Sequence, residues 1–194
     1  MKTARLKEAI ASTAAFLIAI WVVHFFNFLS GMRLSSFGIH PLHLDGLIGI
    51  AAAPFLHSDF GHLMANSSIA LIVVFLIALS GQRVLWQSSI IIAIVSGIGT
   101  WLLGGPNTIH IGASGLVFGW LMFLIVRGFF TRQLLQILVG IGVLLTYGSV
   151  LWGVLPTTPG ISWQAHLFGA VGGLLAASMM GKGKAPTGPS VASV

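Results

Sequence analysis

Two residues of this sequence could form a catalytic pair: Ser114 follows a glycine-containing turn, and His166 precedes a run of small residues. A serine hydroxyl is a weak nucleophile until a base removes its proton, and imidazole can act as that base near neutral pH. The apolar segments that hold the two residues contain no carboxylate, so the sequence predicts a Ser-His dyad rather than a triad. The competing interpretation of each residue alone is structural: a serine N-cap and a buried, hydrogen-bonded histidine.

His62 and Asn66 could supply the hydrogen-bond donors that this chemistry requires. Attack on a carbonyl creates an oxyanion, which N–H groups stabilise. The two residues are four positions apart, so they share one face of a helix. The backbone N–H of Ser114 is a third candidate donor, at a helix N-terminus that favours negative charge. The alternative for His62 and Asn66 is a hydrogen bond that only packs helices together.

The histidines do not predict a metal site. His57 and His62 are five positions apart, which is poor spacing for two ligands on one helix, and no carboxylate follows either of them three or four residues later. His110 lies in a different predicted loop. The sequence contains no cysteine, which excludes disulfides and thiolate ligands. We therefore expect no metal site.

Small residues allow the helix of Ser114 and the helix of His166 to approach closely. After each polar residue, glycines recur at helical spacing and form a small face. These glycines are Gly115 and Gly119 after the serine, and Gly169 and Gly173 after the histidine. Two such faces packed together would bring a serine at the end of one helix close to a histidine at the end of the other.

The composition requires that these elements lie in a membrane. Of 194 residues, 56% are hydrophobic and only 6% are charged. A soluble domain has about 25% charged residues. This excludes a soluble enzyme and a disordered protein. The net charge of +6 comes from scattered cations without a large cluster, which argues against a nucleic-acid partner. We therefore expect an all-α polytopic membrane protein.

Six apolar segments are long enough to cross a bilayer or nearly so. The fourth is short and follows a polar loop, which at membrane depth must be shielded from lipid. The expected spans are 9–29, 61–80, 84–103, 114–127, 133–152 and 163–180. We expect residues 1–8 to form a cytoplasmic N-terminus, 9–180 to form one six-helix domain, and 181–194 to form a disordered cytoplasmic tail.

The distribution of cations predicts the orientation. With both termini in the cytoplasm, eight Lys and Arg residues lie inside and only Arg33 lies outside. Cytoplasmic loops carry such an excess of positive charge. Ser114 and His166 then lie at the outer end of their helices.

Three motifs in order resemble those of the rhomboid intramembrane serine proteases, over roughly residues 55–177. His62 and Asn66 are similar to the family's H-x-x-x-N in helix two, and Ser114 lies in a G-x-S-G motif at the start of helix four. His166 begins a segment similar to the family's helix six, with Gly169 and Gly173 at its glycine positions. Each motif is weak alone, but the three together are specific. The resemblance implies a six-transmembrane-helix rhomboid-like bundle with a short central helix four.

The resemblance also implies roles. Ser114 would be the nucleophile, His166 the general base, and His62 and Asn66 the lining of the oxyanion hole. The supporting residues would be His57, Gly112, Gly115, Phe118, Gly169 and Gly173. The family cleaves single-pass membrane proteins near the outer membrane boundary, with small residues at the cleaved bond and no metal or cofactor. The implied location is the plasma membrane of a bacterium, with multiple spans in the lipid bilayer.

The sequence departs from the family pattern at two points. Many members carry Tyr four residues after the nucleophile, where this sequence has Phe118; the ring remains but its hydroxyl is lost. Many members also carry a Trp-Arg pair in the first loop, where Met32 precedes Arg33 here. Two alternatives remain: an inactive rhomboid-like protein that binds membrane clients, and a small-molecule transporter or channel.

Overall fold

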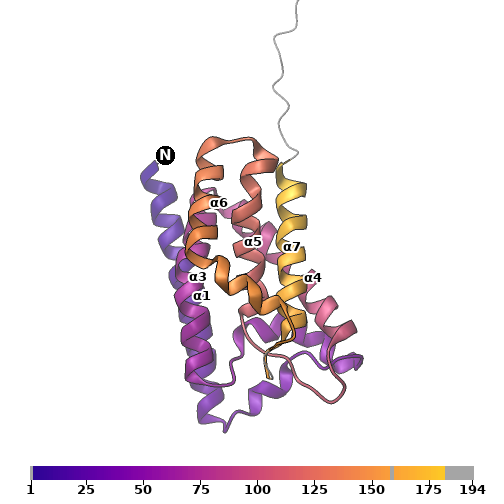
Figure 1. The fold of residues 1–194 in the computed structure, drawn as a ribbon. Coiled ribbons are helices and arrows are strands. Elements are labelled where there is room, and N and C mark those ends of the chain that lie inside the picture. The colour runs from indigo at the N-terminus through magenta and orange to yellow at the C-terminus, as the bar shows by residue number, and fades with distance from the viewer. Residues whose placement is uncertain (1, 158–159, 182–194) are drawn as a thin grey trace, which may run out of the picture.

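The computed structural model describes residues 2–157 and 160–181 as a bundle of helices (Figure 1). The described ranges contain no strand, only one antiparallel bridge between Ile39 and His110. This confirms the all-α fold class. The long helices are α1 (Lys2–Leu29), α3 (Phe60–Leu79), α4 (Gln82–Leu103), α5 (Ser114–Thr131), α6 (Leu134–Tyr147) and α7 (Trp163–Gly181).

Short helices fill the connections. The segment between α1 and α3 folds into η1 (Arg33–Phe37), η2 (Leu44–Ile48), α2 (Gly49–Ala52) and η3 (Ala53–Phe55), and α6 continues into η4 (Gly148–Val154). Figure 1 shows the segment between α1 and α3 at one end of the bundle, opposite the start of α1 and the end of α7. The functional residues predicted from the sequence lie at the end where these short helices pack.

Five of the described helices are long and apolar enough to span a membrane: α1, α3, α4, α5 and the continuous segment 134–154. The sixth predicted span, α7, has 19 residues but carries Gln164, His166 and several glycines, which reduce its hydropathy. It packs along α5 and α4 rather than facing lipid alone. Large apolar side chains on the outer faces of the other helices are exposed, as expected in a bilayer. The chain is a multi-pass membrane protein.

α5 is the most buried of these spans. It contacts α7, α6, α4 and α3, which places Ser114 at one end of a helix in the centre of the bundle. The helix runs four residues beyond the predicted end at residue 127, to Thr131. Within this helix the Arg127 guanidinium lies 5.2 Å from the centroid of the Phe123 ring, one turn earlier. Arg132, with a φ of 55°, terminates the helix in the left-handed conformation.

The two ends of the chain were predicted to lie in the cytoplasm. Residues 2–8, within the predicted cytoplasmic N-terminus, form the first turns of α1. The predicted disordered tail begins at Gly181, which is the last residue of α7, and the rest of it lies outside the described residues.

Candidate active site

Ser114 is the first residue of α5 and follows a turn that requires glycine. Gly112 has a φ of +124°, which side chains rarely adopt. Its N–H donates to the Ala53 carbonyl oxygen at 2.9 Å, which ties the turn to η3. A Cβ atom at position 112 would lie 2.7 Å from Nε2 of His62 and 3.7 Å from Oγ of Ser114. The nucleophile candidate and one oxyanion-hole candidate therefore lie against the same glycine.

His166 lies in the first turn of α7 and is held by contacts on two sides. Its Nδ1 lies 2.9 Å from the carbonyl oxygen of Gly153 in η4. Because a carbonyl only accepts, Nδ1 carries the hydrogen, and Nε2 of the neutral ring is free to accept a proton. The Phe118 ring stacks on the imidazole with centroids 4.0 Å apart and planes 8° apart. The ring is 7% exposed, so its orientation is fixed by these neighbours.

Gly153 was not identified from the sequence. A Cβ at this position would lie 2.8 Å from the Phe118 ring and 3.3 Å from Nδ1 of His166. Only glycine therefore allows the η4 backbone to come close enough for its carbonyl to accept from His166. The sequence carried no signal for this role beyond a single glycine in an apolar segment.

Glycine faces bring α5 and α7 together. A Cβ on Gly169 would overlap the carbonyl oxygen of Gly115, and a Cβ on Gly173 would overlap that of Gly119. These two helices have the most extensive contact in the described structure. The close packing predicted from the small residues is present, and it sets the positions of both Ser114 and His166.

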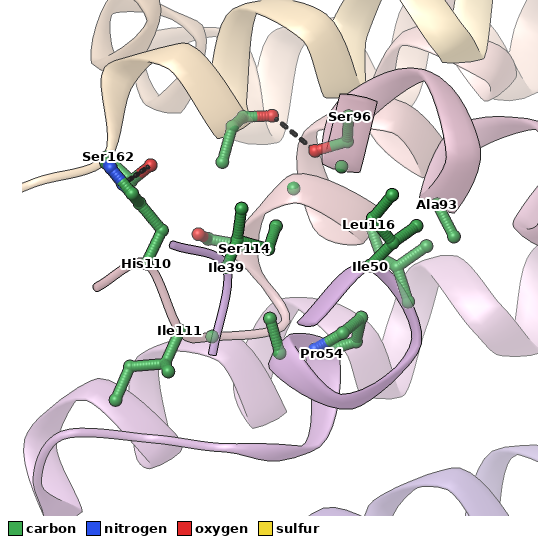
Figure 2. Close-up of a pocket in the computed structure, with 15 residues that line it drawn as sticks. Ile39, Ile50, Pro54, Ala93, Ser96, His110, Ile111, Ser114, Leu116 and Ser162 are labelled. Carbon is green, nitrogen blue, oxygen red and sulfur yellow. Dashed lines mark hydrogen bonds between the residues drawn. The ribbon is translucent and has the colours of Figure 1, made fainter. Parts of the chain in front are cut away.

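Ser96 on α4 forms a further hydrogen bond, to the residue that precedes His166. Its hydroxyl donates to the carbonyl oxygen of Ala165 at 2.9 Å, one residue before His166 (Figure 2). A Cβ on Gly115 would overlap the Ser96 hydroxyl, so Ser96 occupies the space that this glycine leaves. No sequence signal distinguishes Ser96 from the other serines of the chain.

His57 forms a hydrogen bond with the turn that precedes Ser114. Its Nε2 accepts the backbone N–H of Ala113 at 3.5 Å, and the ring is fully buried. Burial, and then the neighbouring His62, lowers the pKa of His57 to about 4. A neutral ring is required here, because the nitrogen that accepts the Ala113 N–H must keep its lone pair. The edge of His57 also faces the His62 ring, with centroids 5.1 Å apart.

His62 and Asn66 lie one turn apart on α3, as predicted. Asn66 is 5% exposed, and within the described part of the chain its Nδ2 has no hydrogen-bond partner. A buried amide without a partner is costly unless a ligand satisfies it. Asn66 therefore has the donor that an oxyanion would require.

A small cavity of about 30 Å³ adjoins Ser114. Figure 2 shows that Ile39, Ile50, Pro54, His110 and Leu116 surround it together with Ser114. Its size suits a methyl-sized group rather than a large side chain.

His110 lines this cavity, and each of its ring nitrogens lies within hydrogen-bond distance of a hydroxyl group. Its Nδ1 lies 2.7 Å from Oγ of Ser162, and its Nε2 lies 2.9 Å from Oγ1 of Thr108. Burial lowers the pKa of His110, which favours the neutral ring that these two hydroxyls need. The loop before α5 is thereby joined to the residues that lead into α7. From the sequence, His110 was considered only as a possible metal ligand.

Ser114 and His166 lie at the same end of adjacent helices, but no hydrogen bond joins their side chains in the part of the chain that the structure describes. Catalytic hydrogen bonds often tighten only when substrate is bound. Among the described residues, no group of three or more His, Asp or Glu side chains is arranged to hold a metal ion.

A family model described as the rhomboid domain matches residues 44–183. An uncharacterized protein of Mycobacterium bovis is 46% identical over 175 residues, covering 85% of this chain and 72% of that protein. An uncharacterized protein of Mycobacterium leprae is 43% identical over the same length. A Bacillus subtilis protein provisionally named a rhomboid protease is 29% identical over 133 residues, which is 62% of this chain and 60% of that protein.

Proposed function

Because the chain belongs to the rhomboid family, we propose that it is an intramembrane serine endopeptidase in which Ser114 is the nucleophile and His166 the general base. One observation supports this most strongly. The Gly153 carbonyl and the Phe118 stack hold His166 with Nε2 available as a base, on a helix packed by glycine contacts against the helix that Ser114 begins.

The reaction follows from these positions. Nε2 of His166 takes the Ser114 proton as Oγ attacks the substrate carbonyl, and the tetrahedral intermediate places negative charge on the carbonyl oxygen. The Asn66 amide, the Ser114 backbone N–H and the His62 ring donate to that oxygen. His166 then gives its proton to the leaving amine, and an acyl-enzyme remains. Water, activated by the same imidazole, releases the second product and restores Ser114.

The substrate class follows from the site's surroundings. The site lies at one end of helices that span the membrane, so a transmembrane segment that unwinds near the bilayer surface can reach it. The cavity of about 30 Å³ beside Ser114 favours a small residue at the cleaved bond. We therefore propose single-pass membrane proteins as substrates.

The proposed orientation has both termini in the cytoplasm of a bacterium and the site at the outer side of the plasma membrane. The distribution of Lys and Arg residues supports it. Figure 1 adds that the start of α1 and the end of α7 lie at the end of the bundle opposite the site's loops.

The alternative is an inactive rhomboid-like protein that binds membrane clients. The buried Asn66 amide without a partner in the described residues argues for the protease, because client binding does not require an unsatisfied donor at this position. A transporter or channel would not require an oriented imidazole next to a serine at a helix N-terminus.

The test is cleavage of a model transmembrane substrate by purified protein in proteoliposomes. Ser114→Ala should abolish cleavage. Ser178→Ala, near the far end of α7, is the matched control and should leave cleavage unchanged, because its hydroxyl only donates to the Leu175 carbonyl one turn earlier. Cleavage by Ser114→Ala at the wild-type rate would refute the proposed function.

A further inference from the structure

An apolar groove separates α1 from α4 on the outside of the bundle. Its volume is about 550 Å³. α1 packs against α3 but has no extensive contact with α4, and most of the α1 residues in the groove are small. Ala15 on one wall and Trp86 on the other are exposed, so the groove opens toward the lipid. The described structure thus leaves a space between two membrane-spanning helices that their own side chains do not fill.

The length of the groove matches the hydrocarbon of one membrane leaflet. The groove extends along residues 11–19 of α1 and 85–93 of α4, and each stretch is about 12 Å long. One leaflet contributes about 15 Å of hydrocarbon. At the end near the candidate active site, Ile50 and Pro54 of the segment α2–η3 line the groove. A helix that crosses the whole bilayer would meet this segment, whereas an acyl chain of one leaflet ends before it.

The polar groups of the groove are already paired within the protein. The Ser12 hydroxyl donates to Oε1 of Gln82 at 2.9 Å. The Ser89 hydroxyl donates to the Leu85 carbonyl oxygen at 2.7 Å and accepts the indole N–H of Trp120 at 3.0 Å. A water molecule in a cavity needs roughly two to four polar partners. The other lining is almost entirely apolar, so hydrocarbon matches this groove better than water does.

Cations lie at the end of the groove where α1 and α4 begin. Arg83 and Lys7 are exposed, and each lies one turn before residues that line the groove. Arg5 adds a third cation, against the single carboxylate of Glu8 in these turns. In the proposed orientation this end faces the cytoplasm, where cations near the membrane surface attract lipid phosphates. Trp86 lies close to the same end, as is typical of a side chain at the membrane interface.

The opposite end of the groove adjoins the candidate active site. Ile50 and Pro54 line both the groove and the small cavity beside Ser114 (Figure 2). Between them in the sequence is Ala53, whose carbonyl oxygen accepts the Gly112 N–H in the turn before the serine. A chain in the groove would therefore contact the segment to which this turn is bonded.

We propose that the groove binds one acyl chain of a phospholipid of the inner leaflet, with its phosphate near Arg83 and Lys7 and the end of its chain against Ile50 and Pro54. The bound chain supports α2 and η3, and through them the turn before Ser114. Lipid binding is independent of the proposed protease function, whereas the effect on the reactivity of Ser114 rests on it.

The first measurement is the binding of phosphatidylglycerol to the purified, delipidated chain, followed by native mass spectrometry. Ala15→Phe places a ring in the groove and should lower the affinity about 10-fold or more. Ala11→Phe, one turn earlier on the same wall, is a second such variant and should act alike. Ala14→Phe is the matched control, because Ala14 is exposed on the same helix but does not line the groove. Wild-type affinity in both Ala15→Phe and Ala11→Phe would overturn the proposal.

The same assay tests the position of the phosphate. Arg83→Gln and Lys7→Gln should each lower the affinity about 5-fold. Arg33→Gln, at the far end of α1, should leave it unchanged. Diacylglycerol with the same chains lacks the phosphate and should bind more weakly. Equal affinity for the two lipids, or no effect of either cation, would overturn the proposal. A dimer that Ala15→Phe disrupts would show a second copy in the groove and would also overturn it.

The second measurement is the rate at which a fluorophosphonate probe labels Ser114. Phosphatidylglycerol added to delipidated protein should raise this rate several-fold in the wild type and in Ala14→Phe, but not in Ala15→Phe. No gain in the wild type, or an equal gain in Ala15→Phe, would overturn the support of the serine by the chain. Absence of labelling in wild-type protein that holds the lipid would instead refute the protease function and leave the lipid site intact.

Discussion

Replacing Gly169 by Ala tests whether helix packing sets the catalytic geometry. A Cβ at this position would overlap the carbonyl oxygen of Gly115, the residue after the proposed nucleophile. Neither group is the end of a flexible side chain, so α7 must move away from α5 by about 1 Å. His166 lies one turn before Gly169 and moves with it.

The expected loss follows from this displacement. A misplacement of about 1 Å can cost on the order of 10²-fold in rate, while overpacking costs about 1–3 kcal/mol of stability. We therefore expect Gly169→Ala to remain folded and to react about 10²-fold more slowly, in both substrate cleavage and covalent labelling by a fluorophosphonate probe.

Gly142→Ala in α6 is the matched control, because a Cβ there would meet nothing within 4 Å. It should keep the wild-type rate, and both variants should elute as monodisperse protein in detergent. A wild-type labelling rate in Gly169→Ala would refute the account of the glycine contacts. An equal loss in Gly142→Ala would show that the effect is not specific to the α5–α7 contact.

Three further predictions concern the ring stack, the buried histidine and the orientation. Phe118→Ala should lower the labelling rate roughly 2- to 10-fold, because it removes the stacked ring from His166, whereas Phe118→Tyr should keep the rate. The pKa of His57 is about 4 in the folded protein, against an ordinary value of 6.5, so below about pH 6.5 protons bind preferentially to the unfolded state. The free energy of unfolding should therefore fall by up to about 3 kcal/mol as the pH drops to about 4. Thermal unfolding in detergent at several pH values measures this change, and a stability that does not change with pH would contradict the prediction. Cysteines introduced at Gly81 and Gly160 should label from opposite sides of the membrane; labelling of both from outside would contradict the proposed orientation.

Much of the fold was predictable because apolar length reports membrane spans directly. The region least well predicted by hydropathy is α7, where Gln164 and His166 reduce the apolar signal but Gly169 and Gly173 permit burial against α5. The sequence predicted this helix as the sixth apolar segment, 163–180, and its small residues predicted the close contact with α5. The helix α5 runs to Thr131, four residues beyond the span expected from its apolar residues.

The candidate catalytic residues were proposed from residue type and spacing, but the contacts that hold them could not be predicted in this way. His166 was selected from the sequence, whereas the acceptor that orients it is the backbone carbonyl of Gly153, which has no side-chain signature. Ser96 is one among many serines, and its contact with the Ala165 carbonyl depends on which element folds beside it. Long-range contacts of this kind are set by the tertiary fold.

The central claim is that His166 activates Ser114. The most direct measurement is mass-spectrometric mapping of the residue that a fluorophosphonate probe modifies in the folded protein, since a serine reacts with such a probe when a base activates it. Modification should occur at Ser114 alone and should vanish in His166→Ala although the serine remains. Modification at another serine, or undiminished labelling of Ser114 without His166, would contradict the account.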